Sequence, residues 1–131
     1  MNAGYSGTPL AQKLSLKDGM HVWFDGMPDS VRVELETVEL DLLDAPEHFF
    51  DVAHVFVTLR ADLETKLSHL RPLLLPGGSI WVSWPKKASR VPTDITEGTI
   101  RDVCLPMGLV DVKVCAVDAI WSGLKLMVRR G

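Results

Sequence analysis

The middle of the sequence alternates short apolar runs with stretches of helical spacing, and this alternation limits the chain to few folds. Residues 51–58 and 79–84 are rich in β-branched and aromatic side chains over the length of a buried strand. Leucines at spacings of four, three and four within 63–74 predict an amphipathic helix between them. Strand, helix, strand, helix and strand over 51–117 is the order that builds a parallel sheet by right-handed crossovers.

Shorter elements flank this block. Before it, we predict a short helix with Thr8 as N-cap and Pro9 as first residue, a strand at 21–24 ending in an Asp25-Gly26 turn, a short helix from Asp29, and a strand at 38–42. Within it and after it, we predict a helix that begins with a capping box of Asp94 and Glu97, and strands at 110–117 and 124–129 joined by a turn at 118–123. The predicted fold is a three-layer α/β sandwich, with a mostly parallel, truncated Rossmann-like sheet and a C-terminal antiparallel hairpin, in one domain over residues 1–131.

Charge is unevenly distributed along the chain. From Asp25 to Asp62 the net charge is -8, whereas from Leu63 onward it is +4. The overall formal charge of -3 argues against a dedicated nucleic-acid binder. The dipolar distribution is able to steer a partner or to favour head-to-tail self-association, and the alternative is that solvated faces simply differ.

Cysteine and histidine patterns predict no metal site, and we also expect no cofactor, because the turn after the first predicted strand has a single glycine. The two cysteines, Cys104 and Cys115, form no CxxC pair, and the four histidines lack zinc-ligand spacing. His54, inside an apolar run, is expected to be a hydrogen-bonded core residue rather than a catalytic base. We recognise no signal peptide and no 18-residue apolar run, so we expect a cytoplasmic location without membrane contact.

The candidate ligand site follows from the geometry of parallel sheets, which bind ligands outside the carboxyl ends of their strands. Basic residues follow the strand at 79–84, and the helix beginning near Thr93 and Asp94 offers free backbone N–H groups to an anion. The alternative is an ordinary basic loop in which Asp94, as N-cap, occupies those donors itself.

We expect the ligand residues to combine charge, aromatic contact area and helix-terminus donors. They are Trp84, Lys86, Lys87, Thr93, Asp94, Thr96, Trp121 and Tyr5. Tyr5 belongs to a glycine-rich segment that either folds over the site as a lid or is a frayed terminus. For Trp84 and Trp121 the alternative is packing in the core or at an edge.

The run from Leu70 to Pro85, with the strand before it and the closing hairpin, resembles the second half of a class I methyltransferase fold. Such enzymes hold S-adenosylmethionine with a Gly-rich turn after the first strand and an acid after the second. Here the first turn, Asp25-Gly26-Met27-Pro28, has one glycine, and residues 26–50 are too few for the two helix-plus-strand units of that family. The resemblance therefore implies a truncated version of the fold.

The chain is also similar to a bacterial family known as domain of unknown function 3052. The similarity rests on Gly4-Tyr-Ser-Gly-Thr-Pro-Leu10, Trp84-Pro-Lys-Lys87, Thr93-Asp-Ile-Thr-Glu97, Asp111-Val-Lys-Val-Cys-Ala116 and Trp121-Ser-Gly-Leu-Lys125. It implies a small bacterial protein and carries no activity across.

Three functions are consistent with these observations. Our first interpretation is a non-catalytic protein that binds a small anionic ligand or a protein partner at the carboxyl edge of the sheet. The alternatives are an S-adenosylmethionine-dependent methyltransferase with an atypical cofactor loop, and a structural module that oligomerises through the exposed edge of the hairpin.

Overall fold

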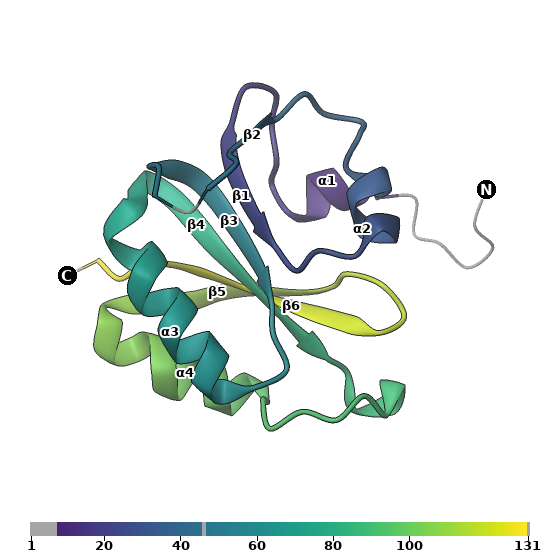
Figure 1. Ribbon diagram of the computed structural model, residues 1–131, viewed down its shortest axis with the longest axis vertical. Helices are drawn as coiled ribbons and strands as arrows, with labels where there is room; N and C mark the ends of the chain where they lie inside the picture. The colour runs from purple at the N-terminus through teal and green to yellow at the C-terminus, as the bar shows by residue number, and fades with distance from the viewer. Residues whose placement is uncertain (1–7, 46, 131) are drawn as a thin grey trace.

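Six strands form a single sheet in the computed structural model, which describes residues 8–45 and 47–130 (Figure 1). In chain order the elements are α1 (Leu10–Lys13), β1 (His21–Asp25), α2 (Asp29–Glu34), β2 (Asp41–Leu42), β3 (Phe50–Phe56), α3 (Arg60–Leu70), η1 (Arg71–Leu73), β4 (Leu74–Pro85), η2 (Lys87–Ser89), α4 (Glu97–Cys104), η3 (Leu105–Met107), β5 (Leu109–Ala116) and β6 (Trp121–Val128).

The sheet has the order β2-β1-β3-β4-β6-β5. Strands β1 to β4 pair in parallel, while β6 lies between β4 and β5 and is antiparallel to both. This topology confirms the predicted fold class, a mostly parallel sheet with an antiparallel C-terminal pair. It also places the reversed strand inside the sheet, so that β5 forms one edge.

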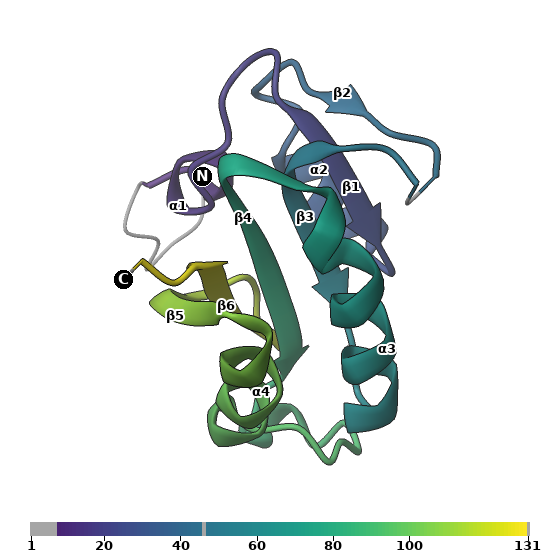
Figure 2. The ribbon, with the colours of Figure 1, turned by 90° about the vertical axis from the view of Figure 1, so that its left-hand side faces the viewer.

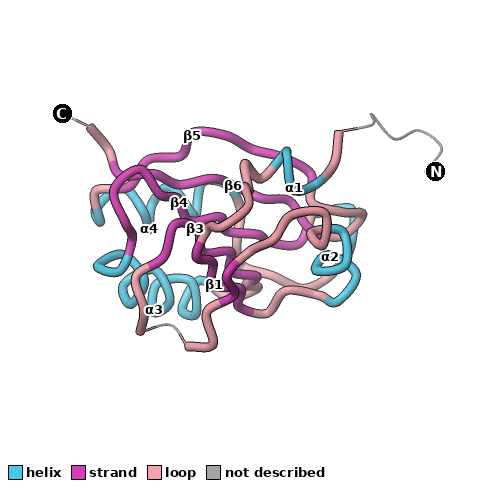
Figure 3. The backbone as a smooth tube through the Cα atoms, turned by 90° about the horizontal axis from the view of Figure 1, so that it is seen from above, coloured by secondary structure: helices cyan, strands magenta, loops and turns pink. Residues whose placement is uncertain are grey.

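Helices cover both faces of the sheet, as Figures 2 and 3 show, because β3 and β4 are apolar on both sides. Alternate residues of a strand point to opposite faces. Ala53 and Val55 of β3 therefore pack with α3 and α4, whereas Val52 and Phe56 pack with α1 and α2. Trp81 of β4 links the sheet to the layer of α1 and α2, since its indole Nε1 donates to the Leu14 carbonyl oxygen over 3.1 Å.

The predicted strand at 38–42 is wrong over most of its length, because only Asp41 and Leu42 pair with β1. The backbone just before them is hydrogen-bonded elsewhere. Glu39 N–H donates to the Asp18 carboxylate, and the Glu39 carbonyl accepts from Gly19 N–H. The loop at 18–19 therefore takes the hydrogen bonds that a longer β2 would need.

Three predicted boundaries are also wrong by a few residues. The N-cap of α1 is Pro9 rather than Thr8, and Trp121 begins β6 rather than lying in the preceding turn. The N-cap of α4 is Thr96, whose hydroxyl accepts from Thr99 N–H while Thr99 Oγ1 accepts from Thr96 N–H. This reciprocal pair of bonds replaces the predicted box of Asp94 and Glu97.

Candidate functional site

The carboxyl ends of β1, β3 and β4 meet at one edge of the sheet, where ligands of parallel sheets bind. The turn after β1 contains Gly26, whose φ of +72° is a conformation that side chains disfavour. An added Cβ would stand 3.2 Å from the Phe56 carbonyl oxygen. Both the backbone angle and this close approach to β3 explain why a glycine stands here.

The carboxyl half of β1, which leads into this turn, is bare: on its outer side it pairs with no described strand. Because β2 ends opposite Val22, the residues from Trp23 to Asp25 pair with β3 alone among the described strands. Two hollows flank this bare half, one on each face of the sheet.

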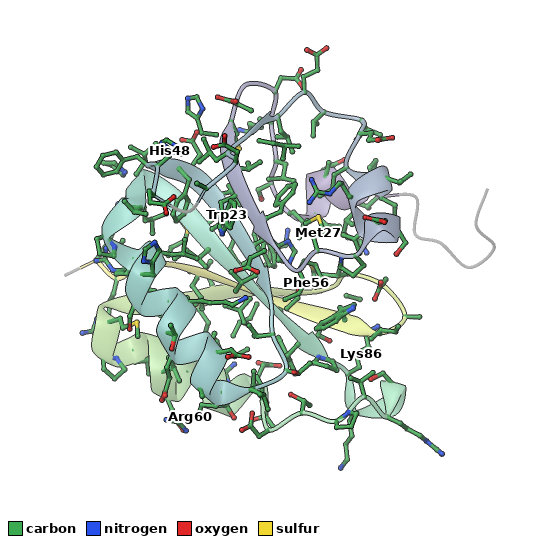
Figure 4. The ribbon with its side chains drawn as sticks, viewed as in Figure 1. Trp23, Met27, His48, Phe56, Arg60 and Lys86 are labelled. Atoms are coloured by element: carbon green, nitrogen blue, oxygen red, sulfur yellow. The ribbon has the colours of Figure 1, made fainter. Side chains whose placement is uncertain are left out.

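The hollow on the α3 side has a volume of about 250 Å³. It is lined by Trp23, Asp25, Thr65, Lys66, His69 and Leu70. The Lys66 ammonium lies 2.8 Å from the Asp25 carboxylate, and both side chains are about 30% exposed. An aromatic face, a carboxylate and an ammonium therefore meet at the carboxyl end of β1; Figure 4 labels Trp23 there.

The hollow on the α2 side is wider, at about 440 Å³. Phe24 and Arg32 lie at its base, with the guanidinium carbon 5.6 Å from the ring centroid, a cation–π distance. Glu36 and Glu39 contribute its acidic side chains. It occupies the flank of α2 and the residues that lead into β2.

A row of aromatic side chains continues the site across β3 and β6. The Phe56 ring meets Trp121 edge-on at 5.1 Å and stacks on His54 at 4.5 Å. His54 is 1% exposed, and its Nε2 lies 2.7 Å from Ser83 Oγ, while Nδ1 has no hydrogen-bond partner. Burial lowers the pKa of His54 to about 3, so the imidazole is neutral at physiological pH. The structure agrees with a core residue, as expected, rather than a solvent-accessible base.

The structure does not gather the predicted ligand residues into one hollow. Trp84 is 8% exposed and packs in the core with α3 and α4. Lys86 and Lys87 follow the carboxyl end of β4, and the Lys86 N–H donates to the Ile120 carbonyl oxygen. Figure 4 labels Lys86 there. Neither hollow beside β1 is lined by these three residues, and their role as ligand residues stays a prediction.

The remaining predicted residues have other contacts. Thr93 donates its hydroxyl to the Thr58 carbonyl over 2.6 Å, and the Asp94 carboxylate accepts from Arg60 N–H over 2.7 Å. Asp94 therefore accepts a hydrogen bond from a backbone N–H in the first turn of α3, and does not cap α4. Thr96 caps α4, Trp121 belongs to the aromatic row, and Tyr5 lies outside the described residues.

Sequence reasoning missed Trp23, Lys66 and Arg32 as site residues. A signal for Lys66 was present, since it lies three residues after Leu63 and four before Leu70, on the face of α3 that turns to the sheet. No comparable signal existed for Trp23 and Arg32, because their exposure depends on where β2 ends.

Comparison with known proteins finds no matching protein family and no curated relative in sequence, but it finds similar solved structures. A structure from Sulfolobus solfataricus described as a type 11 methyltransferase has a TM-score of 0.68 at 13% identity, over 93% of this chain and 90% of that one. Precorrin-6y C5,15-methyltransferase from Geobacter metallireducens GS-15 has a TM-score of 0.65 at 12% identity, over 91% and 85%. An S-adenosylmethionine-dependent methyltransferase from Aquifex aeolicus has a TM-score of 0.61 at 16% identity, over 91% and 89%.

The chain has a methyltransferase-like fold. This finding contradicts our first interpretation, a non-catalytic binding protein, and the expectation that the chain is not an enzyme, because the three similar structures above are of methyltransferases. It favours the methyltransferase alternative. At sequence identities of 12%, 13% and 16%, the structural similarity establishes the fold and not the reaction.

The described residues fit one end of S-adenosylmethionine. The Trp23 indole offers a face for a nucleobase, and the Asp25 carboxylate accepts hydrogen bonds from hydroxyl groups. The hollow of about 250 Å³ is smaller than the roughly 300 to 1,000 Å³ of sites that enclose whole drug-sized ligands. It therefore suits the adenosine part rather than the complete cofactor.

Two further results concern residues 8–45 and 47–130. No helix there has both the length and the apolar character needed to cross a bilayer. No group of three or more histidine, cysteine, aspartate or glutamate side chains in the same ranges is arranged to hold a metal ion.

Proposed function

We propose that this chain is an S-adenosylmethionine-dependent methyltransferase whose cofactor binds against the bare carboxyl half of β1. The fold supports this proposal, and one local observation carries it. The left-handed Gly26 turn stands at the carboxyl end of β1, next to a hollow that combines Trp23 with the Asp25–Lys66 pair.

Each of these residues has a distinct role in the proposal. Trp23 stacks on the adenine, and Asp25 accepts hydrogen bonds from the ribose hydroxyls while Lys66 holds the carboxylate in place. Gly26 lets the backbone make a left-handed turn beside the hollow, close to the Phe56 carbonyl oxygen of β3. The bound cofactor supplies an electrophilic methyl group, and the chain contributes by holding donor and acceptor in one orientation.

Calorimetric titration with S-adenosylmethionine and with its demethylated product tests the proposal. We expect the wild-type chain to bind both, and Gly26→Ala to weaken binding about tenfold or more, equivalent to about 1.4 kcal/mol. Gly77→Ala controls for the strain of a positive φ, because Gly77 has a φ of +79° but lies at the opposite end of β4 from the site. Circular dichroism verifies that Gly26→Ala, whose Cβ would stand 3.2 Å from the Phe56 carbonyl oxygen, is folded. Millimolar or weaker binding by the wild-type chain would leave the proposal without a cofactor.

A second pair of variants tests the hollow itself. Asp25→Asn removes the carboxylate proposed to bind the ribose, and we expect a loss of about tenfold in affinity. Glu64→Gln is its control, since Glu64 also forms an ion pair on α3, with Arg60 at 3.1 Å. Equal losses in the two variants would indicate that the effect comes from α3 and not from the site.

Membership of the family known as domain of unknown function 3052 is part of the same proposal, together with a bacterial source and a cytoplasmic location. The sequence segments quoted above support it. Immunodetection of the chain in fractionated bacterial cells tests the location, and recovery with the membrane or periplasmic fraction would contradict it.

A further inference from the structure

We infer that this chain associates head to tail, the basic β5 end of one sheet docking on the acidic β2 end of a second copy. The two ends lie on opposite sides of the molecule (Figure 2), and in the sheet order they are the two edges. The inference does not depend on the proposed methyltransferase function.

The β2 end combines exposed apolar side chains with aspartate and histidine side chains. Leu42 is 50% exposed and Phe49 is 62% exposed, and both line a hollow of about 530 Å³. Asp41 and Asp44 also line this hollow. The chain has no lysine or arginine between Arg32 and Arg60, and the two acids of this hollow pair with histidines instead, Asp41 with His21 and Asp44 with His48.

The β5 end has the complementary character. Val112 and Val114 are 50% and 54% exposed, although both belong to a strand of the sheet. Basic side chains accompany them: exposed Arg129 and Arg130 follow β6, which pairs with β5, and Lys113 lies between the two valines, with its ammonium donating to the Lys13 carbonyl oxygen over 2.8 Å. Exposed apolar residues on an edge strand are a natural surface for pairing with another chain.

Strand direction and charge both favour pairing of β5 with the β2 of a second copy. Because β6 is antiparallel to β4 and to β5, β5 runs in the same direction as β4 and, through it, as β2. A second copy whose β2 pairs with this β5 therefore continues the parallel pairing, related to the first copy by a translation and a rotation that follows the twist of the sheet, and it brings opposite charges together. A two-fold arrangement of β5 on β5 would instead place two basic ends against each other.

The β5 edge also carries two features that restrict its partners. Its ladder with β6 has an irregularity between Asp111 and Lys113, and lysine on an edge strand opposes indiscriminate pairing. Neither feature opposes an acidic partner. The β2 end of the same protein is such a partner, and it is present at the same concentration.

Sedimentation velocity of the full chain over a range of concentrations tests the inference. We expect association that grows with concentration and weakens between about 50 mM and about 500 mM NaCl, because salt screens attraction between exposed charges. A monomer at every concentration in low salt would overturn the inference, as would association that strengthens with salt.

Two variants distinguish head-to-tail docking from two-fold pairing. The first is Leu42→Lys with Phe49→Lys, and the second is Val112→Lys with Val114→Lys; all four sites are exposed, and circular dichroism verifies folding. Each variant alone should be monomeric. Mixed, they should form a 1:1 dimer that grows no further, since each supplies the end that the other lacks.

Every other outcome contradicts the inference. If either variant alone still associates, pairing is two-fold through its unchanged end, and if the mixture stays monomeric, the partner is a different protein. Leu59→Lys with Val91→Lys is the matched control, as both residues are exposed and lie at neither end of the sheet. It should associate like the wild-type chain.

Discussion

Gly78 stands where β4 passes so near to β3 that a side chain has no room. A Cβ built on Gly78 would lie 2.4 Å from the Asp51 carbonyl oxygen, whereas one on Gly77 would meet no atom within 4 Å. The neighbouring glycines therefore serve different purposes: Gly77 allows a positive φ, and Gly78 allows two strands to approach.

We expect Gly78→Ala to destabilise the protein by about 3 kcal/mol, at the upper end of the range for overpacking, because the backbone of β3 must move. Gly77→Ala should cost only about 1 to 2 kcal/mol, the strain of a left-handed side-chain residue. Urea unfolding of both variants measures the difference. Equal costs would show that β3 and β4 adjust to the added methyl group.

His54 makes stability depend on pH. Its pKa is lowered to about 3 in the folded protein by burial, against 6.5 for the free side chain, so the unfolded chain binds a proton that the folded one excludes. The stability due to neutral His54 is complete above about pH 6.5 and is lost as the pH falls toward 3. The expected slope is at most about 1.4 kcal/mol per pH unit.

Comparison of the wild-type chain with His54→Gln isolates this contribution. Glutamine does not titrate and retains a hydrogen-bonding group for Ser83. We expect the urea midpoint of the variant to fall less steeply between about pH 6 and pH 4. Parallel curves for the two proteins would assign the acid sensitivity to other groups.

At the scale of elements, the Asp94 side chain links the loop between β4 and α4 to α3, which begins 34 residues earlier in the chain. The residue before α3, Leu59, has no side chain that can cap the helix, and the Asp94 carboxylate accepts from Arg60 N–H instead. Thr93 strengthens the attachment through the Thr58 carbonyl. The loop between β4 and α4 is thereby fixed over the end of β3.

We expect Asp94→Ala to destabilise the protein by about 1 kcal/mol, the typical cost of losing a helix cap. The N–H of Arg60 would then depend on water for a partner. Asp102→Ala, at an exposed position within α4, is the control and should change stability by less than about 0.5 kcal/mol. Thermal unfolding monitored by circular dichroism distinguishes the two.

At the scale of the whole molecule, both helical layers pack on one sheet, and we predict a single domain that unfolds cooperatively. Trp81 is fully buried and hydrogen-bonds to the α1 layer, while Trp84 packs in the layer of α3 and α4. Tryptophan fluorescence and far-ultraviolet circular dichroism should therefore give coincident denaturation curves. Two separated transitions would indicate that the layers unfold independently.

Local patterns in the sequence were sufficient for the fold class and for most elements. Apolar runs predicted β3 and β4, and leucine spacing predicted α3, because these features record burial of residues near in sequence. Between residues 26 and 50 the described part of the chain has one helix, α2, and one strand, β2, where the family pattern given above has two such units. The length of β2 was beyond such patterns, since the hydrogen bonds of Glu39 go to a loop twenty residues earlier.

The candidate site was harder to predict for the same physical reason. Sequence alone determined that a glycine turn ends β1 and that acidic and basic residues occupy different halves of the chain. Only the tertiary structure decided that Asp94 serves α3, that Trp84 is core, and that Lys66 meets Asp25 beside an uncovered strand. These outcomes depend on which segments lie together in space, and contacts between residues distant in sequence leave no periodic signal in either partner.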